Sequence, residues 1–141
     1  MRTIKFKAKS KNGGTWVYGD LHHTADGKAL IERELENTAS KSWEVIPETV
    51  CQYSGLRDME GREIYEGDIL ECTGKRADNM GMTFRREVRF WKGAFVMIIT
   101  RSFGRVLTSA LATHIENGRV SWRVAENIHD NEQTAEEGGP F

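Results

Sequence analysis

Apolar and polar residues alternate in short runs along most of this chain, and glycine-rich turns separate the runs. From Thr3 to Lys9, the apolar side chains of TIKFKAK fall on one face and three lysines fall on the other. A period of two residues is typical of a half-buried β-strand. The sequence KNGG then predicts a turn, so residues 3–21 are expected to form a β-hairpin.

A second hairpin is predicted in the arginine-rich part of the chain. In residues 82–91, MTFRREVRFW, Phe84 and Val88 share one face of the expected strand. Lys92 and Gly93 predict a turn into residues 94–100. Their nearly unbroken apolar sequence, AFVMIIT, fits a strand that is buried on both faces.

Two segments leave the choice of element open. Residues 32–41 are polar and fit a short helix or a loop, and residues 106–115 fit a short helix or a strand. Asn117 and Gly118 form the strongest two-residue hairpin signal, which predicts a turn into a last strand over residues 120–128. These elements add up to a mainly β fold with one or two short helices.

Composition limits the classes of protein to which the chain can belong. A length of 141 residues fits one compact domain or two small lobes. The net charge of −1 does not predict bulk binding to polyanions. The charged residues are nevertheless unevenly distributed along the sequence. Basic residues dominate residues 1–28 and 75–105, and acidic residues dominate residues 29–74 and 106–141.

Neither a membrane span nor a secretory signal is expected. No apolar run approaches the roughly 18 residues of a spanning helix, and no apolar stretch follows the basic N-terminus. The two cysteines, Cys51 and Cys72, are too few for a disulfide scaffold or a four-cysteine zinc site. We expect reduced thiols in a cytoplasm, with a Cys51–Cys72 disulfide as the alternative.

Catalytic and metal-binding residue patterns are weak. Glu66 and Asp68 could share one face of a strand and act as a carboxylate pair, but no third ligand is apparent. His22 and His23 are adjacent, so on a strand they point to opposite faces and chelate a metal poorly. No phosphate loop, dinucleotide motif or nucleophile elbow is present. The sequence therefore predicts no enzyme activity and no cofactor.

Nucleic-acid binding is a more specific alternative than catalysis or metal binding. Basic side chains with aromatic residues between them are typical of surfaces that bind single strands. The predicted second hairpin carries such a set, namely Arg85, Arg89, Trp91, Lys92 and Arg101. The opposing interpretation is that Arg85 and Arg89 pair with nearby acids such as Glu87 and that Trp91 lies half-buried in the core.

The segment PETVCQYSGLRDMEGREIYEGDIL, residues 47–70, resembles the central motif of the YopX family of phage and prophage proteins. The N-terminal RTIKFKAKSKNGGTWVYGDL is similar to the family's opening hairpin, and VAENIHDNEQ resembles its closing segment. The residues that carry the central resemblance are Gln52, Tyr53, Gly55, Asp58, Gly61, Ile64, Tyr65, Gly67 and Asp68. Cys51 stands where the family commonly has glycine, which argues against a shared metal or redox role.

The resemblance implies a mostly β protein without an assigned activity. It implies an N-terminal β subdomain over residues 1–50, a barrel-like C-terminal subdomain over residues 51–131 and a flexible tail over residues 132–141. The central motif would then be a structural joint between the subdomains. It further implies self-association of a phage or prophage protein in the cytoplasm of a bacterial host. Exposed edge strands and an exposed apolar pair, Val96 and Ile98, would support contacts with a protein partner.

Overall fold

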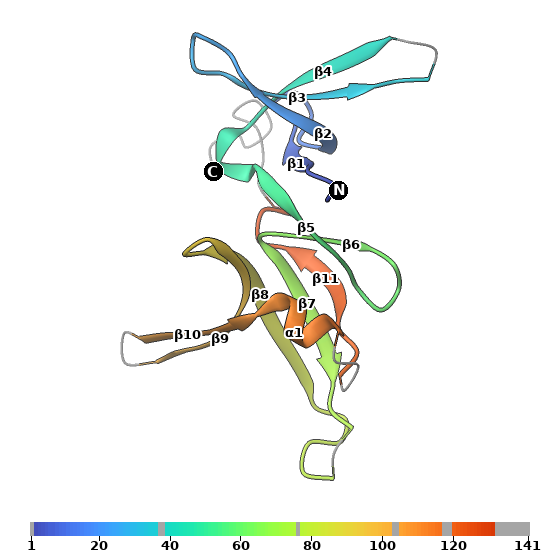
Figure 1. The fold of residues 1–141 in the computed structure, drawn as a ribbon, viewed down its shortest axis with the longest axis vertical. Helices are drawn as coiled ribbons and strands as arrows, with labels where there is room; N and C mark the ends of the chain where they lie inside the picture. Colours follow the sequence, from blue (N-terminus) through green and yellow to red (C-terminus); the bar gives the residue numbers. More distant parts are fainter. Residues whose placement is uncertain (1, 37–38, 76, 103–104, 117–119, 132–141) are drawn as a thin grey trace. The chain divides into compact units, whose positions relative to one another are not determined.

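The chain folds into two compact units in a computed structural model that describes residues 2–36, 39–75, 77–102, 105–116 and 120–131. The side chains of residues 100–107 are not described. Unit 1 comprises residues 1–53 and 129–141, and unit 2 comprises residues 54–128. Most described residues lie in antiparallel β-strands, so the predicted mainly β fold is confirmed (Figure 1). The predicted tail over residues 132–141 lies outside the described residues.

Unit 1 is built around the predicted N-terminal hairpin. Its elements are β1 (Phe6–Lys9), β2 (Trp16–His23), β3 (Ala29–Glu34), β4 (Ser40–Val45), the 3₁₀-helix η1 (Pro47–Thr49) and the first part of β5 (Cys51–Arg57). The strands follow the order β4-β3-β2-β1-β5 in one sheet, and β1 pairs with β2 as expected. The expected helix is not found in the described part of residues 32–41, and a loop accounts only for the connection after Glu34, because β3 and β4 form a hairpin there.

Small and branched side chains fill the core of unit 1, with Ala8, Val17, Ala29, Ile31 and Val45 at its centre. Gly19 lets β2 approach β3 closely, since a Cβ atom at this position would lie 2.3 Å from the carbonyl oxygen of Glu32. The sheet curls far enough for Ser10 to form a β-bridge with Val45. A backbone hydrogen bond of 2.9 Å from Ile46 to Lys9 reinforces this contact.

Both faces of β1 are covered, although its lysines alternate with apolar residues. Lys7 and Lys9 are only 8% and 7% exposed. The Lys7 ammonium lies 4.6 Å from the centre of the Trp16 ring, and the Lys9 ammonium donates a 2.8 Å hydrogen bond to the carbonyl oxygen of Asp130. Trp16 in turn donates to the Asp130 carboxylate through its Nε1 atom at 3.0 Å. Trp16 and Asp130, which are far apart in the sequence, thus cover the basic face of β1.

Unit 2 contains a second antiparallel sheet and one short helix. Its elements are β6 (Glu63–Tyr65), β7 (Asp68–Thr73), β8 (Thr83–Trp91), β9 (Ala94–Ser102), β10 (Arg105–Ala110), α1 (Leu111–Glu116) and β11 (Arg123–Asn127). The sheet has the order β10-β9-β8-β7-β11. Its two outer strands do not pair with each other within the described residues, so the expected barrel-like closure is not observed.

The core of unit 2 lies between this sheet, α1 and the strands of the central motif. Its fully buried side chains include Ile64, Leu70, Val88, Met97 and Leu111. The central position of β9 is confirmed, since it lies between β8 and β10. Val96 and Ile98 are each only 7% exposed, so the expectation that they form an exposed apolar pair is wrong.

Of the turns predicted in unit 2, the turn between β8 and β9 is confirmed and the hairpin before the last strand is not. Lys92 and Gly93 have positive φ angles of 48° and 86° and connect β8 to β9, as predicted. Residues 106–115 contain both expected elements, because β10 leads directly into α1. Asn117 and Gly118 lie outside the described residues. The predicted hairpin is nevertheless wrong, because the following strand, β11, pairs with β7.

Helical structure in the described ranges is short. The helix α1 has six residues, and no helix in those ranges is long and apolar enough to cross a membrane.

Candidate functional site

The central motif occupies β5, β6, the start of β7 and the turns between these strands. In β5, Gln52 pairs with Phe6, and the buried Tyr53 donates a backbone hydrogen bond of 2.9 Å to Lys5. The three glycines of the motif, Gly55, Gly61 and Gly67, have positive φ angles of 87°, 83° and 83°. The motif thus supplies one strand edge to unit 1 and two tight turns to unit 2.

Asp58 organises the first turn through a carboxylate that is fully shielded from solvent. Its Oδ1 atom accepts hydrogen bonds from the backbone N–H groups of Glu60 at 2.8 Å and Arg62 at 2.9 Å. Its Oδ2 atom accepts a hydrogen bond from the backbone of Val124 at 2.8 Å. The turn itself was expected from the sequence, but the link from Asp58 to β11 was not.

Asp68 organises the second turn and is fully buried. Its two carboxylate oxygens accept hydrogen bonds from the backbone N–H of Tyr65 and from Nδ2 of Asn127, each at 2.8 Å. A Cβ atom at Gly67 would lie 3.2 Å from that Nδ2 atom, which leaves little room for a side chain. Asp68 is therefore a buried acid that stabilises this turn, and its partner Asn127 was not expected from the sequence.

The described residues that were considered as metal ligands do not gather into a metal site. Asp68 already accepts N–H groups of the chain at both oxygens, while Glu66 is half-buried beside it. His22 and His23 are exposed neighbours on β2. Within the described ranges, no group of three or more His, Cys, Asp or Glu residues is placed to hold a metal ion.

The arginines of the second hairpin are largely engaged in ion pairs. Arg89 donates hydrogen bonds to one Glu87 oxygen from Nη2 at 2.6 Å and from Nε at 3.1 Å. Arg85 lies 3.3 Å from the Glu126 carboxylate and 3.7 Å from that of Glu71. These contacts match the opposing interpretation of a solvated, charge-paired face.

The tip of the same hairpin keeps a cation beside an aromatic ring. Trp91 is 36% exposed, and the Lys92 ammonium lies 5.9 Å from the centre of its ring. The side chain of Arg101, the remaining member of the predicted set, lies outside the described residues. The structure therefore brings together only Trp91 and Lys92 as an accessible pair.

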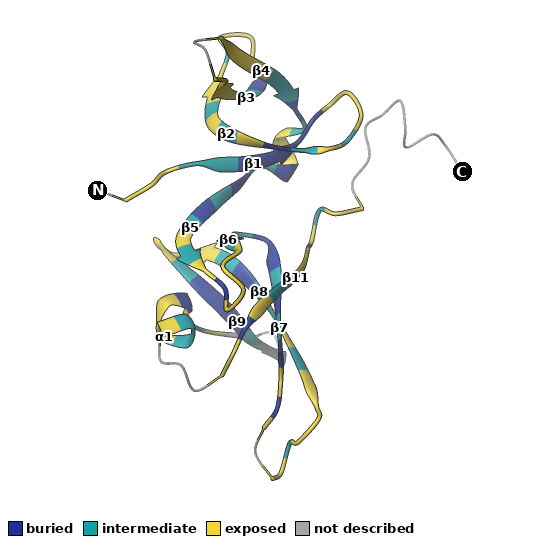
Figure 2. Cartoon of the chain, turned by 90° about the vertical axis from the view of Figure 1, so that its right-hand side faces the viewer, coloured by how far each residue is buried: buried dark blue, intermediate teal, exposed yellow. Residues whose placement is uncertain are grey.

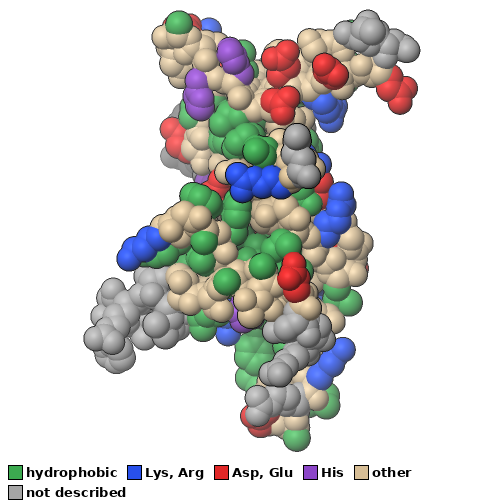
Figure 3. Space-filling view, in the orientation of Figure 1, with side chains coloured by type: hydrophobic (Ala, Val, Ile, Leu, Met, Phe, Trp, Pro, Cys, Tyr) green, Lys and Arg blue, Asp and Glu red, His purple; other side chains and the backbone are tan. Residues whose placement is uncertain are grey.

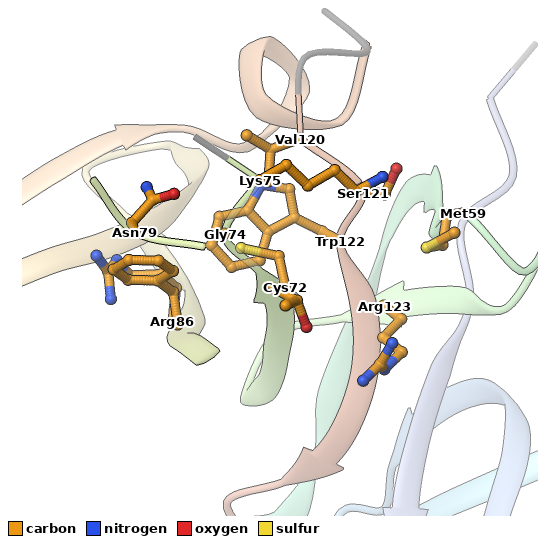
Figure 4. A pocket seen from close by; sticks show the side chains of 12 residues that line it. Met59, Cys72, Gly74, Lys75, Asn79, Arg86, Val120, Ser121, Trp122 and Arg123 are labelled. Atoms are coloured by element: carbon orange, nitrogen blue, oxygen red, sulfur yellow. The ribbon is translucent and has the colours of Figure 1, made fainter. Parts of the chain in front are cut away.

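A cavity of about 530 Å³ opens on unit 2 (Figure 4). Met59, Phe84, Val120 and Trp122 supply its apolar lining, and Cys72 lies beside them. Burial raises the pKa of the Cys72 thiol, so it remains neutral at physiological pH. Both cysteines are free and buried, and Cys51 lies in unit 1.

The far part of the β3–β4 hairpin forms an arm, defined here as residues 32–42. Figure 1 shows it extending beyond the other strands of unit 1, and every described residue in it is exposed. Exposed residues occupy both faces of the ribbon (Figure 2). On the face drawn in Figure 3, acidic side chains gather over this hairpin. Among the described residues, the arm therefore has no buried face.

Comparisons with known proteins identify the fold and the family. A family model described as YopX protein matches residues 5–134. The crystal structure of protein EF1440 from Enterococcus faecalis superimposes with a TM-score of 0.53 and 18% sequence identity, covering 93% of this chain and 96% of that chain. That likeness shows a shared fold. No curated protein matches the sequence significantly.

Proposed function

This chain belongs to the YopX protein family, and we propose that it is a non-enzymatic interaction protein that self-associates through its arm. It would act in the cytoplasm of a bacterium that carries a phage or prophage. The observation that carries the proposal is the arm itself, because both of its faces are exposed in the single chain.

A two-stranded ribbon is only marginally stable in water when it packs against nothing. The arm is held by its ladder, which runs from Ala29 and Val45 to Glu34 and Ser40, and by cation–π contacts at its base. There, the Arg33 and Lys41 side chains lie 5.3 and 5.1 Å from the centre of the Trp43 ring. A second protein surface would supply the packing that the described part of the chain does not provide.

A second copy of the chain is the proposed occupant. Strand β4 ends the sheet of unit 1, and its Ser40–Trp43 portion has no strand on its outer side within the described ranges. Such an edge offers backbone donors and acceptors to another strand. Most homo-oligomers use two-fold contacts, in which the same patch serves both subunits. A β4 edge that meets its own copy satisfies this condition.

Sedimentation velocity tests the proposal. We expect the wild-type protein to form a discrete oligomer as its concentration rises through the micromolar range. Leu35 is 39% exposed in the arm, and Leu35→Asp should weaken assembly because it places a charge in the contact. Met82 is a matched control, 53% exposed and outside the arm, so Met82→Asp should assemble normally. A monomer at every concentration would overturn the proposal.

Nucleic-acid binding is the second candidate, and it rests on the accessible Trp91 and Lys92 pair. Anisotropy with labelled single- and double-stranded DNA and RNA, at two salt concentrations, separates it from self-association. Salt-sensitive binding that is lost in Lys92→Glu would support this candidate. Lys92 makes no ion pair with a described residue, so its replacement should leave the fold intact. Absence of binding at low salt would remove the candidate.

A further inference from the structure

The unit 2 cavity combines an apolar lining with an excess of positive charge. Lys75, Arg86 and Arg123 line it, and no described aspartate or glutamate does. Arg123 is partly neutralised, because its Nη2 atom donates a hydrogen bond to Glu71 at 2.9 Å. Lys75 and Arg86 have no carboxylate within ion-pair distance among the described residues, so their charges remain available to a ligand.

Aromatic surfaces form the inner part of the cavity. Trp122 is only 8% exposed and belongs to the core of unit 2. Figure 4 shows its ring in the middle of the lining side chains, with Arg86 and Arg123 on opposite sides of it. The Arg86 guanidinium lies 5.8 Å from the centre of the Phe84 ring, so a planar cation and an aromatic ring are neighbours here. Flat rings stack on such surfaces.

The connection between β7 and β8 holds the mouth of the cavity in shape. Gly74 donates a backbone hydrogen bond to Met82 at 2.7 Å and accepts one from Gly81 at 3.1 Å. A Cβ atom at Gly74 would lie 2.3 Å from the carbonyl oxygen of Asn79, so this position must be glycine for the connection to close. Lys75 follows directly and is an exposed residue in the lining of the cavity.

We infer that this cavity binds an anionic ligand with a flat aromatic ring, of the nucleotide class. The ring would lie against Trp122 and Phe84, and the phosphate oxygens would accept hydrogen bonds from Lys75 and Arg86. A volume of about 530 Å³ lies within the range of small-molecule sites. Guanidinium groups match phosphate oxygens in geometry, and lysine adds a point charge. The ligand can be a free nucleotide or one nucleotide of a single strand.

Titration with nucleoside monophosphates, followed by two-dimensional NMR of the full chain, tests the inference. We expect saturable shifts in the resonances of the residues around Trp122. Lys75→Gln and Arg86→Gln should each weaken binding about tenfold, because each removes a charged hydrogen bond. Lys28→Gln is the control, since Lys28 is an exposed cation of unit 1 that does not line the cavity, and it should bind normally.

Further probes separate the sources of the ligand. Tighter binding of a short single-stranded oligonucleotide than of the monophosphates would identify nucleic acid as the source, and equal or weaker binding would identify the free nucleotide. Inorganic phosphate and the uncharged nucleosides should bind much more weakly than the monophosphates. The inference is overturned if neither nucleotide form binds at millimolar concentration. It is also overturned if phosphate alone binds equally well, or if both cavity variants bind as the wild type does.

Discussion

Replacing Asp58 with alanine tests how the central motif holds unit 2 together. The substitution removes three hydrogen bonds from backbone N–H groups to a shielded carboxylate. Hydrogen bonds to charged groups contribute about 1.5–3 kcal/mol each. Two of the donors, at Glu60 and Arg62, are in an exposed turn where water can replace the carboxylate, so they count for less. We expect the free energy of unfolding to fall by about 3 kcal/mol.

Urea denaturation measures this loss through the unfolding midpoint and through the slope of the free energy of unfolding against urea concentration. For a unit of this size, the expected loss corresponds to a melting temperature about 12–24 °C lower. Glu60→Ala is the matched control, because Glu60 is an exposed acid in the same turn that forms a surface ion pair with Arg62. It should change stability by less than about 0.5 kcal/mol. Equal effects of Asp58→Ala and Glu60→Ala would refute the role assigned to Asp58.

Three further predictions follow from particular contacts. Gly61 and Gly67 share a φ angle of 83°, but only Gly67 has neighbours within 4 Å of a new Cβ atom, so Gly67→Ala should lower the melting temperature more than Gly61→Ala. Burial raises the pKa of Cys72, so the neutral thiol stabilises the fold below about pH 8.5, and this contribution is lost as the pH rises further. Urea midpoints of the wild type should therefore fall more steeply between neutral and alkaline pH than those of Cys72→Ala. Asp130→Ala removes the acceptor of the Trp16 indole N–H, so the free energy of unfolding should fall by about 0.5–1 kcal/mol. Unfolding followed by tryptophan fluorescence measures this loss. An unchanged midpoint would mean that this exposed contact contributes nothing to stability.

Local rules predicted the elements whose signals lie within a few residues. The N-terminal hairpin followed from alternation and a glycine turn, and the turn at Lys92 and Gly93 followed from residues that tolerate positive φ. The arm escaped prediction because none of its described residues is buried, so no apolar alternation marks its strands. Likewise, the burial of Lys7 and Lys9 depends on Trp16 and Asp130, which no local pattern connects to them.

Most of the candidate site depends on contacts between distant segments. The carboxylate of Asp58 reaches Val124, and that of Asp68 reaches Asn127, across sequence separations of 66 and 59 residues. The cavity around Trp122 likewise draws on segments that are far apart in the sequence. Arginine clustering in the sequence pointed to a basic surface, but the ion pair between Arg89 and Glu87 shows that charge density alone does not define a binding site.

Hydrogen exchange of the backbone amides in residues 32–42, measured at low and at high protein concentration, tests self-association through the arm most directly. In the single chain the described residues of the arm are exposed, and an unsupported ribbon is only marginally stable, so we expect rapid exchange at low concentration. At high concentration, self-association through the arm should give strong protection confined to the arm and the β4 edge. Rapid exchange of the arm at both concentrations, while the core of unit 1 stays protected, would contradict it.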